Sequence, residues 1–108
     1  MNNDVVIIEL DRPRELRFGY KALKRMVAMT GKSIEDITQF NFDIENLEMI
    51  EKIMYCGLLS DAQKNGETLK LEDMEDLLDI KPLPYIMEKM AEAFTAAFGT
   101  PQGDDMGK

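Results

Sequence analysis

The stretch VVIIELDRPRELRFGYKALKRMVAMTGKS, residues 5–33, determines how this chain begins its fold. Its first half alternates apolar and polar residues in two short runs, which is typical of two strands that each bury one face. The apolar positions of this alternation are Val6, Ile8, Leu10, Leu16 and Phe18. Arg12, Pro13 and Arg14 lie between the runs and have the chemistry of a turn. The pattern predicts a β-hairpin over residues 5–18.

An amphipathic helix is predicted directly after the hairpin, over residues 20–30. Leu23, Met26 and Val27 recur at helical spacing, and Gly31 is placed to end the helix. Similar apolar patterns recur along the rest of the chain. They are separated by capping residues, by an Asn-Gly turn and by prolines, which mark where helices begin and end. The further helices expected from these signals span residues 33–39, 43–60, 71–80 and 84–98. The predicted fold class is therefore α+β, an N-terminal β-hairpin packed on four or five short helices.

The order of the N-terminal motifs resembles the opening of the tail assembly chaperones of long-tailed bacteriophages and prophages. The motifs are Asp-x-Pro, Leu-Arg-Phe-Gly, Ala-Leu-Lys-Arg and Thr-Gly-Lys-Ser, all within residues 11–33. A looser likeness continues through residues 55–59, 71–78 and 91–94, so it covers most of the chain. Lys70 departs from the pattern, because a small polar cap is expected before residues 71–73.

The resemblance implies a function without catalysis. Members of this family bind the tape measure protein, a very long helical chain, and help to bring tail tube subunits to it. They act in the cytoplasm of the host bacterium and are absent from the finished virion. The resemblance carries over no catalytic residue and no cofactor.

Length and composition agree with one soluble domain. The chain has 108 residues, of which 44% are hydrophobic and 31% charged, and this size supports a core without metal or disulfide. Residues 1–99 are expected to form the domain and residues 100–108 a disordered tail. No run approaches the roughly 20 apolar residues of a membrane span, and a signal peptide pattern is missing, so we expect no membrane partner and a cytosolic location.

The charge is distributed unevenly along the chain, whose formal net charge is −8. Residues 11–32 hold seven Lys or Arg and two acids, whereas residues 43–79 hold eleven acids and three Lys. One interpretation is self-association, in which the basic part of one copy meets the acidic part of the next. The alternative is that both are simply solvated faces.

Catalytic constellations are missing from the sequence. Without histidine, the commonest general base and the commonest zinc ligand are both absent. Cys56 lies in an apolar helical stretch and reads as a buried thiol rather than a nucleophile. Residues 30–33 match the end of a phosphate-binding loop, but they lack its leading glycine and follow a helix. We therefore predict no catalytic, cofactor or metal site.

Two other functions are kept as alternatives. Residues 61–72 match the pattern of a calcium loop between two helices. Asp61 and Glu72, the first and last ligands of this pattern, are its only charged ligands, and the two ligands between them are neutral. The loop is therefore expected to bind calcium weakly at best. The acidic region 43–79 could act as a decoy for a nucleic-acid-binding protein. Nucleic-acid binding by this chain itself is not expected, because its basic cluster has few aromatic neighbours. That cluster is Arg12, Arg14, Arg17, Lys21, Lys24 and Arg25.

The nine methionines suggest where a partner would bind. Methionine is flexible and polarizable, and surfaces that bind varied apolar helices use it often. The alternative is that methionine only fills the core. The final predicted helix has the widest apolar stripe, and its candidate protein-binding residues are Met87, Met90, Phe94 and Phe98.

Overall fold

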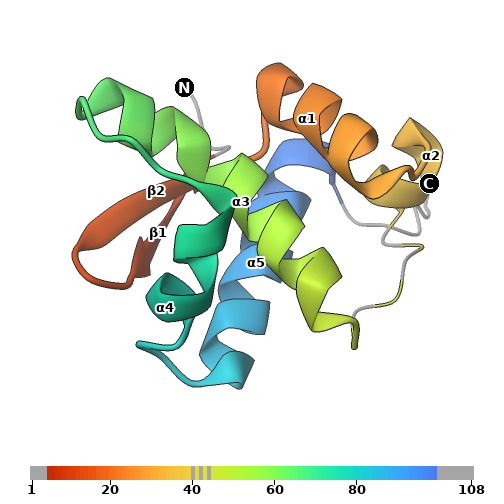
Figure 1. The fold of residues 1–108 in the computed structure, drawn as a ribbon. Coiled ribbons are helices and arrows are strands. Elements are labelled where there is room, and N and C mark those ends of the chain that lie inside the picture. The colour runs from red at the N-terminus through yellow and green to blue at the C-terminus, as the bar shows by residue number, and fades with distance from the viewer. Residues whose placement is uncertain (1–4, 40, 42, 44, 100–108) are drawn as a thin grey trace.

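A computed structural model describes residues 5–39, 41, 43 and 45–99, and it begins with the hairpin (Figure 1). Strand β1 (Val5–Glu9) pairs antiparallel with β2 (Pro13–Arg17), and Ile8 lies opposite Arg14. Ile8, Leu16 and Phe18 are buried, as the alternation predicted. Arg14 lies on the same buried face and is only 5% exposed.

Five α-helices follow the hairpin in the described part of the chain. They are α1 (Tyr20–Thr30), α2 (Ile34–Thr38), α3 (Leu47–Lys64), α4 (Met74–Leu78) and α5 (Leu83–Phe98), and a 3-10 turn, η1 (Leu71–Asp73), precedes α4. Gly31 ends α1 in the left-handed conformation, with φ of 75°. Ser33 caps α2 by accepting the N–H of Asp36. The α+β fold class is confirmed.

Helices α3 and α4 differ from their predicted limits. Helix α3 begins after Asn46, whose side chain accepts the N–H of Met49, rather than at Asp43. It then continues to Lys64, four residues beyond its predicted end at residue 60. The predicted helix over 71–80 is a 3-10 turn followed by the short α4. The predicted tail, 100–108, lies outside the described residues.

The hairpin lies between α3, which contacts β2, and α5, which contacts β1. Both strands are edge strands, so their outward N–H groups need partners from elsewhere. The carboxylate of Asp61 in α3 accepts the N–H of Glu15 in β2 at 3.2 Å. On the other edge, the hydroxyl of Tyr85 in α5 accepts the N–H of Glu9 in β1 at 2.9 Å. Each of the two longest helices therefore supplies a hydrogen-bond acceptor to one edge of the sheet.

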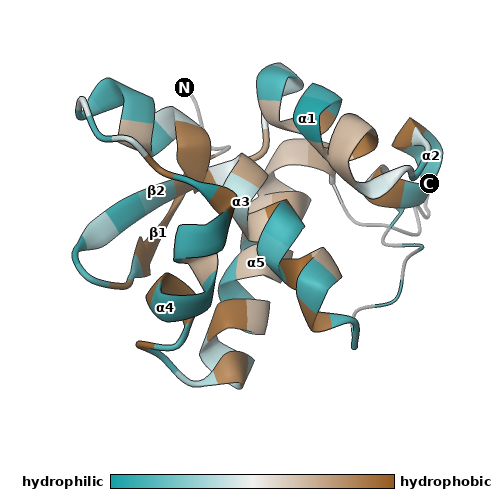
Figure 2. Cartoon of the chain, viewed as in Figure 1, coloured by the Kyte–Doolittle hydropathy of each residue, from teal (hydrophilic) through white to brown (hydrophobic). Residues whose placement is uncertain are grey.

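The core forms where the hairpin, α3 and α5 meet. The rings of Phe18 and Phe94 contact edge to face, with centroids 4.5 Å apart. All seven described methionines are either buried in this core or packed against it. Figure 2 shows hydrophobic segments at the start of α3, in α4 and in the first turns of α5. No described helix is both long and apolar enough to cross a membrane.

Candidate functional site

The four residues predicted to bind a partner do not form one exposed stripe. Met90 and Phe94 are each 1% exposed and belong to the core. Met87 and Phe98 are half-buried and pack against it, and the ring of Phe98 lies edge to face on that of Phe94. The stripe faces inward because α5 packs against both strands of the hairpin. The methionine-rich face of α5 is thus mostly core, which corrects the prediction.

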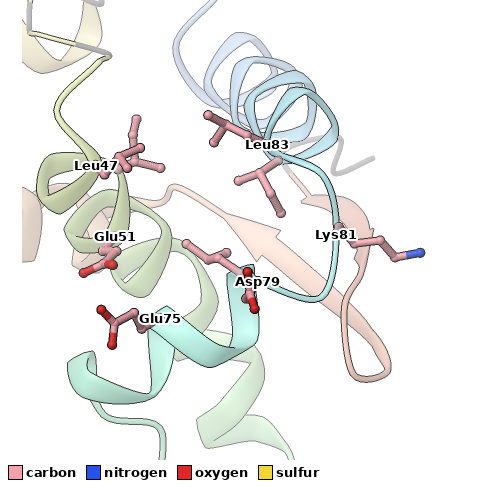
Figure 3. Close-up of a pocket in the computed structure, with 9 residues that line it drawn as sticks. Leu47, Glu51, Glu75, Asp79, Lys81 and Leu83 are labelled. Carbon is pink, nitrogen blue, oxygen red and sulfur yellow. The ribbon is translucent and has the colours of Figure 1, made fainter.

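An open apolar groove lies at the other end of α5 (Figure 3). It has a volume of about 240 Å³ and runs between the first turns of α3 and α5 and the end of α4. Ile50 and Ile86 are buried at its floor. Leu47, 59% exposed, and Leu83, 50% exposed, stand on its two sides. The groove is therefore a candidate surface for an apolar partner, because two large apolar side chains are exposed along it.

Helical spacing explains how each element contributes to the groove. Leu47, Ile50 and Glu51 follow one another at i, i+3 and i+4, so they share one face of α3. Leu83 and Ile86 are likewise one turn apart in α5. The helices α3 and α4 are in contact, and the short chain after α4 brings the start of α5 beside them.

The rim of the groove is acidic. Glu51, Glu75 and Asp79 line it, and none of the three forms an ion pair with another described residue. Lys81 is the one basic residue among those lining the groove. Its side chain points away from the groove (Figure 3), and its ammonium lies 5.5 Å from the centre of the Tyr85 ring. Three carboxylates that form no ion pair with a described residue therefore lie beside an apolar floor.

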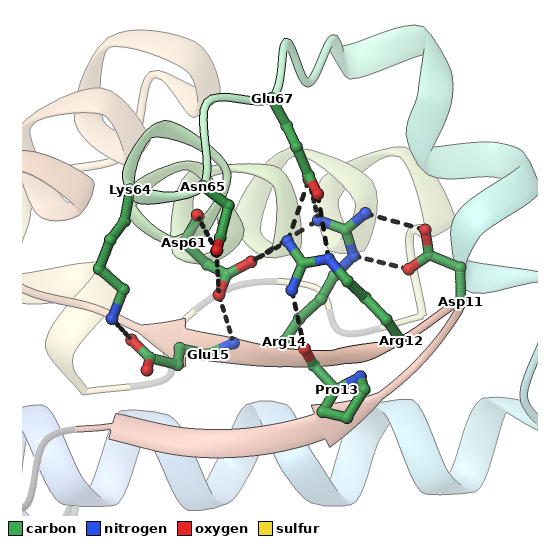
Figure 4. A network of polar contacts seen from close by, with 9 residues as sticks. All are labelled: Asp11, Arg12, Pro13, Arg14, Glu15, Asp61, Lys64, Asn65 and Glu67. Carbon is green, nitrogen blue, oxygen red and sulfur yellow. Dashed lines mark hydrogen bonds and ion pairs between the residues drawn. The ribbon is translucent and has the colours of Figure 1, made fainter.

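A second polar feature joins the hairpin turn to the end of α3 (Figure 4). The guanidinium of Arg12 donates to Asp61 at 2.6 Å and to both carboxylate oxygens of Glu67 at 3.0 Å. Arg14 donates to both oxygens of Asp11, at 2.7 and 2.9 Å, and to Glu67 at 3.1 Å. The buried face of β2 requires such partners, because Arg14 would otherwise be a buried unpaired charge.

This network lowers the pKa of two carboxyl groups. Hydrogen bonding by Arg14 holds the pKa of Asp11 below its usual range, against a smaller opposing effect of burial. Hydrogen bonding by Arg12 does the same to Glu67. The basic hairpin thus meets acids of its own chain, so Arg12 and Arg14 are already paired. The self-association hypothesis loses these two cations as free contacts.

The calcium-loop hypothesis does not match the position of its first ligand. Asp61 is 3% exposed and lies inside α3, not at the start of a loop. Its carboxylate already accepts hydrogen bonds from Arg12 and from the N–H of Glu15. In the described part of the chain, no three His, Cys, Asp or Glu side chains are grouped so that they could hold a metal ion.

Cys56 is buried in α3, as the sequence predicted, with 1% of its surface exposed. Its thiol lies 3.6 Å from the sulfur of Met29. Burial raises the pKa of the thiol to about 11, and Arg25 opposes this only in part. A thiol that stays protonated at neutral pH is a poor nucleophile.

A smaller apolar hollow lies on α1 and α2. It is lined by Tyr20, Leu23, Val27 and Ile34, together with Lys24. Tyr20 is 82% and Ile34 58% exposed. Lys24 is the one charged residue among those lining this hollow, whereas the groove is lined by three acids and Lys81.

Comparison of the chain with models of known protein families, with curated proteins and with solved structures found no match.

Proposed function

We propose that this protein is a non-enzymatic assembly chaperone of phage or prophage tails. In this proposal it binds the tape measure protein and helps to recruit tail tube subunits in the host cytoplasm, and it is left out of the virion. The sequence motifs of residues 11–33 support the choice of family.

The observation that carries the proposal is the open apolar groove between α3, α4 and α5. A groove lined by exposed leucines over a buried floor is the kind of surface that takes the apolar face of a helix. The small domain remains soluble because its formal net charge is −8. Such a domain can cover an aggregation-prone helix without forming a large permanent interface.

The test is co-elution in size-exclusion chromatography with the tape measure protein of the same phage. The wild-type chain is compared with a double variant, Leu47→Ser with Leu83→Ser, which removes both exposed sides of the groove. The matched control is Ile7→Ser with Ile34→Ser. These isoleucines are 48% and 58% exposed, and neither lines the groove.

We expect the wild type and the control to co-elute with the tape measure protein and the groove variant to elute alone. Because both pairs of residues are exposed, circular dichroism should show that each variant remains folded. Absence of a complex with the wild-type chain would refute the proposed function. Each run is repeated with calcium and with a chelator. A complex that needs calcium would support the alternative binding module instead.

A further inference from the structure

We infer that the groove selects a helix whose apolar stripe is flanked by lysine or arginine. This inference rests on the proposed function and deepens it, because it names the chemistry of the client segment. Selection depends on the charged rim of the groove, whereas the proposed function depends on its apolar floor and sides.

The apolar surface of the groove has the shape that a helix can fill. The sides of the groove are single leucines, Leu47 and Leu83, each at the first position of its helix. Between them Ile50, Leu78 and Ile86 line the surface. An amphipathic helix places apolar residues on one face every three or four positions, so one or two of its turns can fill such a groove.

The charge beside that apolar surface is mainly negative. Glu51 lies in α3, Glu75 lies in α4 and Asp79 directly follows α4, and all three line the same groove. A client that covers the apolar floor removes water from the space beside these carboxylates, which strengthens their interaction with any charge the client brings. Acidic flanks would then be repelled, and basic flanks would find three acceptors that need no rearrangement of an existing ion pair.

The C-terminal residues of this chain and a second copy of it are the other candidate occupants of the groove. Residues 100–108 contain one methionine among polar residues, glycine and proline, so their composition cannot supply an apolar stripe. A second copy of the chain could offer the exposed side chains of Tyr20 and Ile34, which lie in the same part of the surface as Lys24. That contact would make the free protein associate with itself, which the test below detects.

The probe is a pair of amphipathic peptides of about 18 residues, long enough for a helix to form on binding. Both carry the same leucine stripe. One has lysine and the other glutamate at the positions that flank the stripe. Binding of each peptide to the full chain is measured by fluorescence anisotropy at low and at high salt, and the free protein is measured by analytical ultracentrifugation.

We expect the lysine peptide to bind at least about fivefold more tightly than the glutamate peptide at low salt, and this ratio to shrink at high salt. The double variant Glu51→Lys with Glu75→Lys should reverse the preference. The control Glu35→Lys with Glu88→Lys makes the same change of formal net charge, from −8 to −4, at exposed sites that do not line the groove. It should leave the lysine peptide preferred.

Three results would overturn the inference. Equal binding of the two peptides, lost in the Leu47→Ser with Leu83→Ser variant, would show an apolar groove without charge selection, and the proposed function would stand. If neither peptide bound while the tape measure protein still co-eluted, the tape measure protein would bind at a surface other than the groove. If the free protein self-associated and the double variant Glu51→Lys with Glu75→Lys abolished this association, the groove would bind a second copy of the chain.

Discussion

Gly57→Ala should destabilise the protein, although alanine is the better helix former. Gly57 lies inside α3, where the change to alanine favours the helix by about 1 kcal/mol in isolation. A Cβ atom at this position would lie 2.6 Å from Cδ1 of Leu16 and 2.7 Å from Cε1 of Phe18. Carbon atoms in favourable contact are about 3.5–4.0 Å apart, so both side chains would have to move.

The size of the effect follows from how little room these side chains have. Leu16 is fully buried, and the ring of Phe18 is already in contact with that of Phe94. Inserting a methyl group into such a core costs about 1–3 kcal/mol, and the upper part of that range applies here. After the gain in helix propensity, we expect a net loss of about 2 kcal/mol, which lowers the melting temperature by roughly 10 °C.

Urea unfolding followed by circular dichroism measures this change. Ser60→Ala is the control, because Ser60 is an exposed residue of the same helix and its replacement should stabilise by only a few tenths of a kcal/mol. In a Leu16→Val background, Gly57→Ala should cost less, because the nearest carbon is withdrawn. If Gly57→Ala raised the midpoint as helix propensity alone requires, the packing of α3 against β2 would be wrong.

Three further predictions concern the polar network and the thiol. Asp61→Ala removes the acceptor of the Glu15 N–H at a site that is almost fully buried, so it should cost about 1–3 kcal/mol in urea unfolding; a change below about 0.5 kcal/mol would contradict this account. Because the pKa values of Asp11 and Glu67 are lowered in the folded state from 3.8 and 4.5, their contribution is complete at higher pH and is lost as pH falls below these values. The urea midpoint should therefore fall between pH 5 and pH 3, and less so in Glu67→Gln. Cys56, with its pKa near 11, should react with Ellman's reagent only after unfolding; rapid reaction of the native protein at pH 8 would show that α3 opens.

The elements that the sequence predicted well are those with local signals at both ends. Alternation fixed the faces of the hairpin, and Gly31 and Ser33 mark the end of α1 and the start of α2. The start of α3 was misplaced because Asp43 and Asn46 are equally good caps by residue type. Its end was misplaced because Asp61 is held by Arg12, a contact over 49 residues of sequence that no local pattern contains.

The site was harder to predict than the fold. An apolar stripe on α5 shows only that the helix faces something, and Met90 and Phe94 turned out to face the core. The groove is assembled from three helices, and Leu47 and Leu83 become neighbours only after packing. One available signal was missed: Arg14 alternates with Leu16 and Phe18, so it had to be buried and paired.

The acidic rim also explains how the protein can leave an apolar groove open. Two copies that met groove to groove would bring six carboxylates together, three from each rim, around a surface from which water is being removed. Such a symmetric contact is opposed by like charges. Asp61 and Glu67 add nothing to this repulsion, because they pair with Arg12 and Arg14. The three rim acids therefore disfavour groove-to-groove pairing of this protein, and the same acids would favour a basic partner of the proposed site. The acidic rim would then both limit self-association of the free protein and set the selectivity of the proposed site, and Glu51→Gln with Glu75→Gln should weaken both effects together.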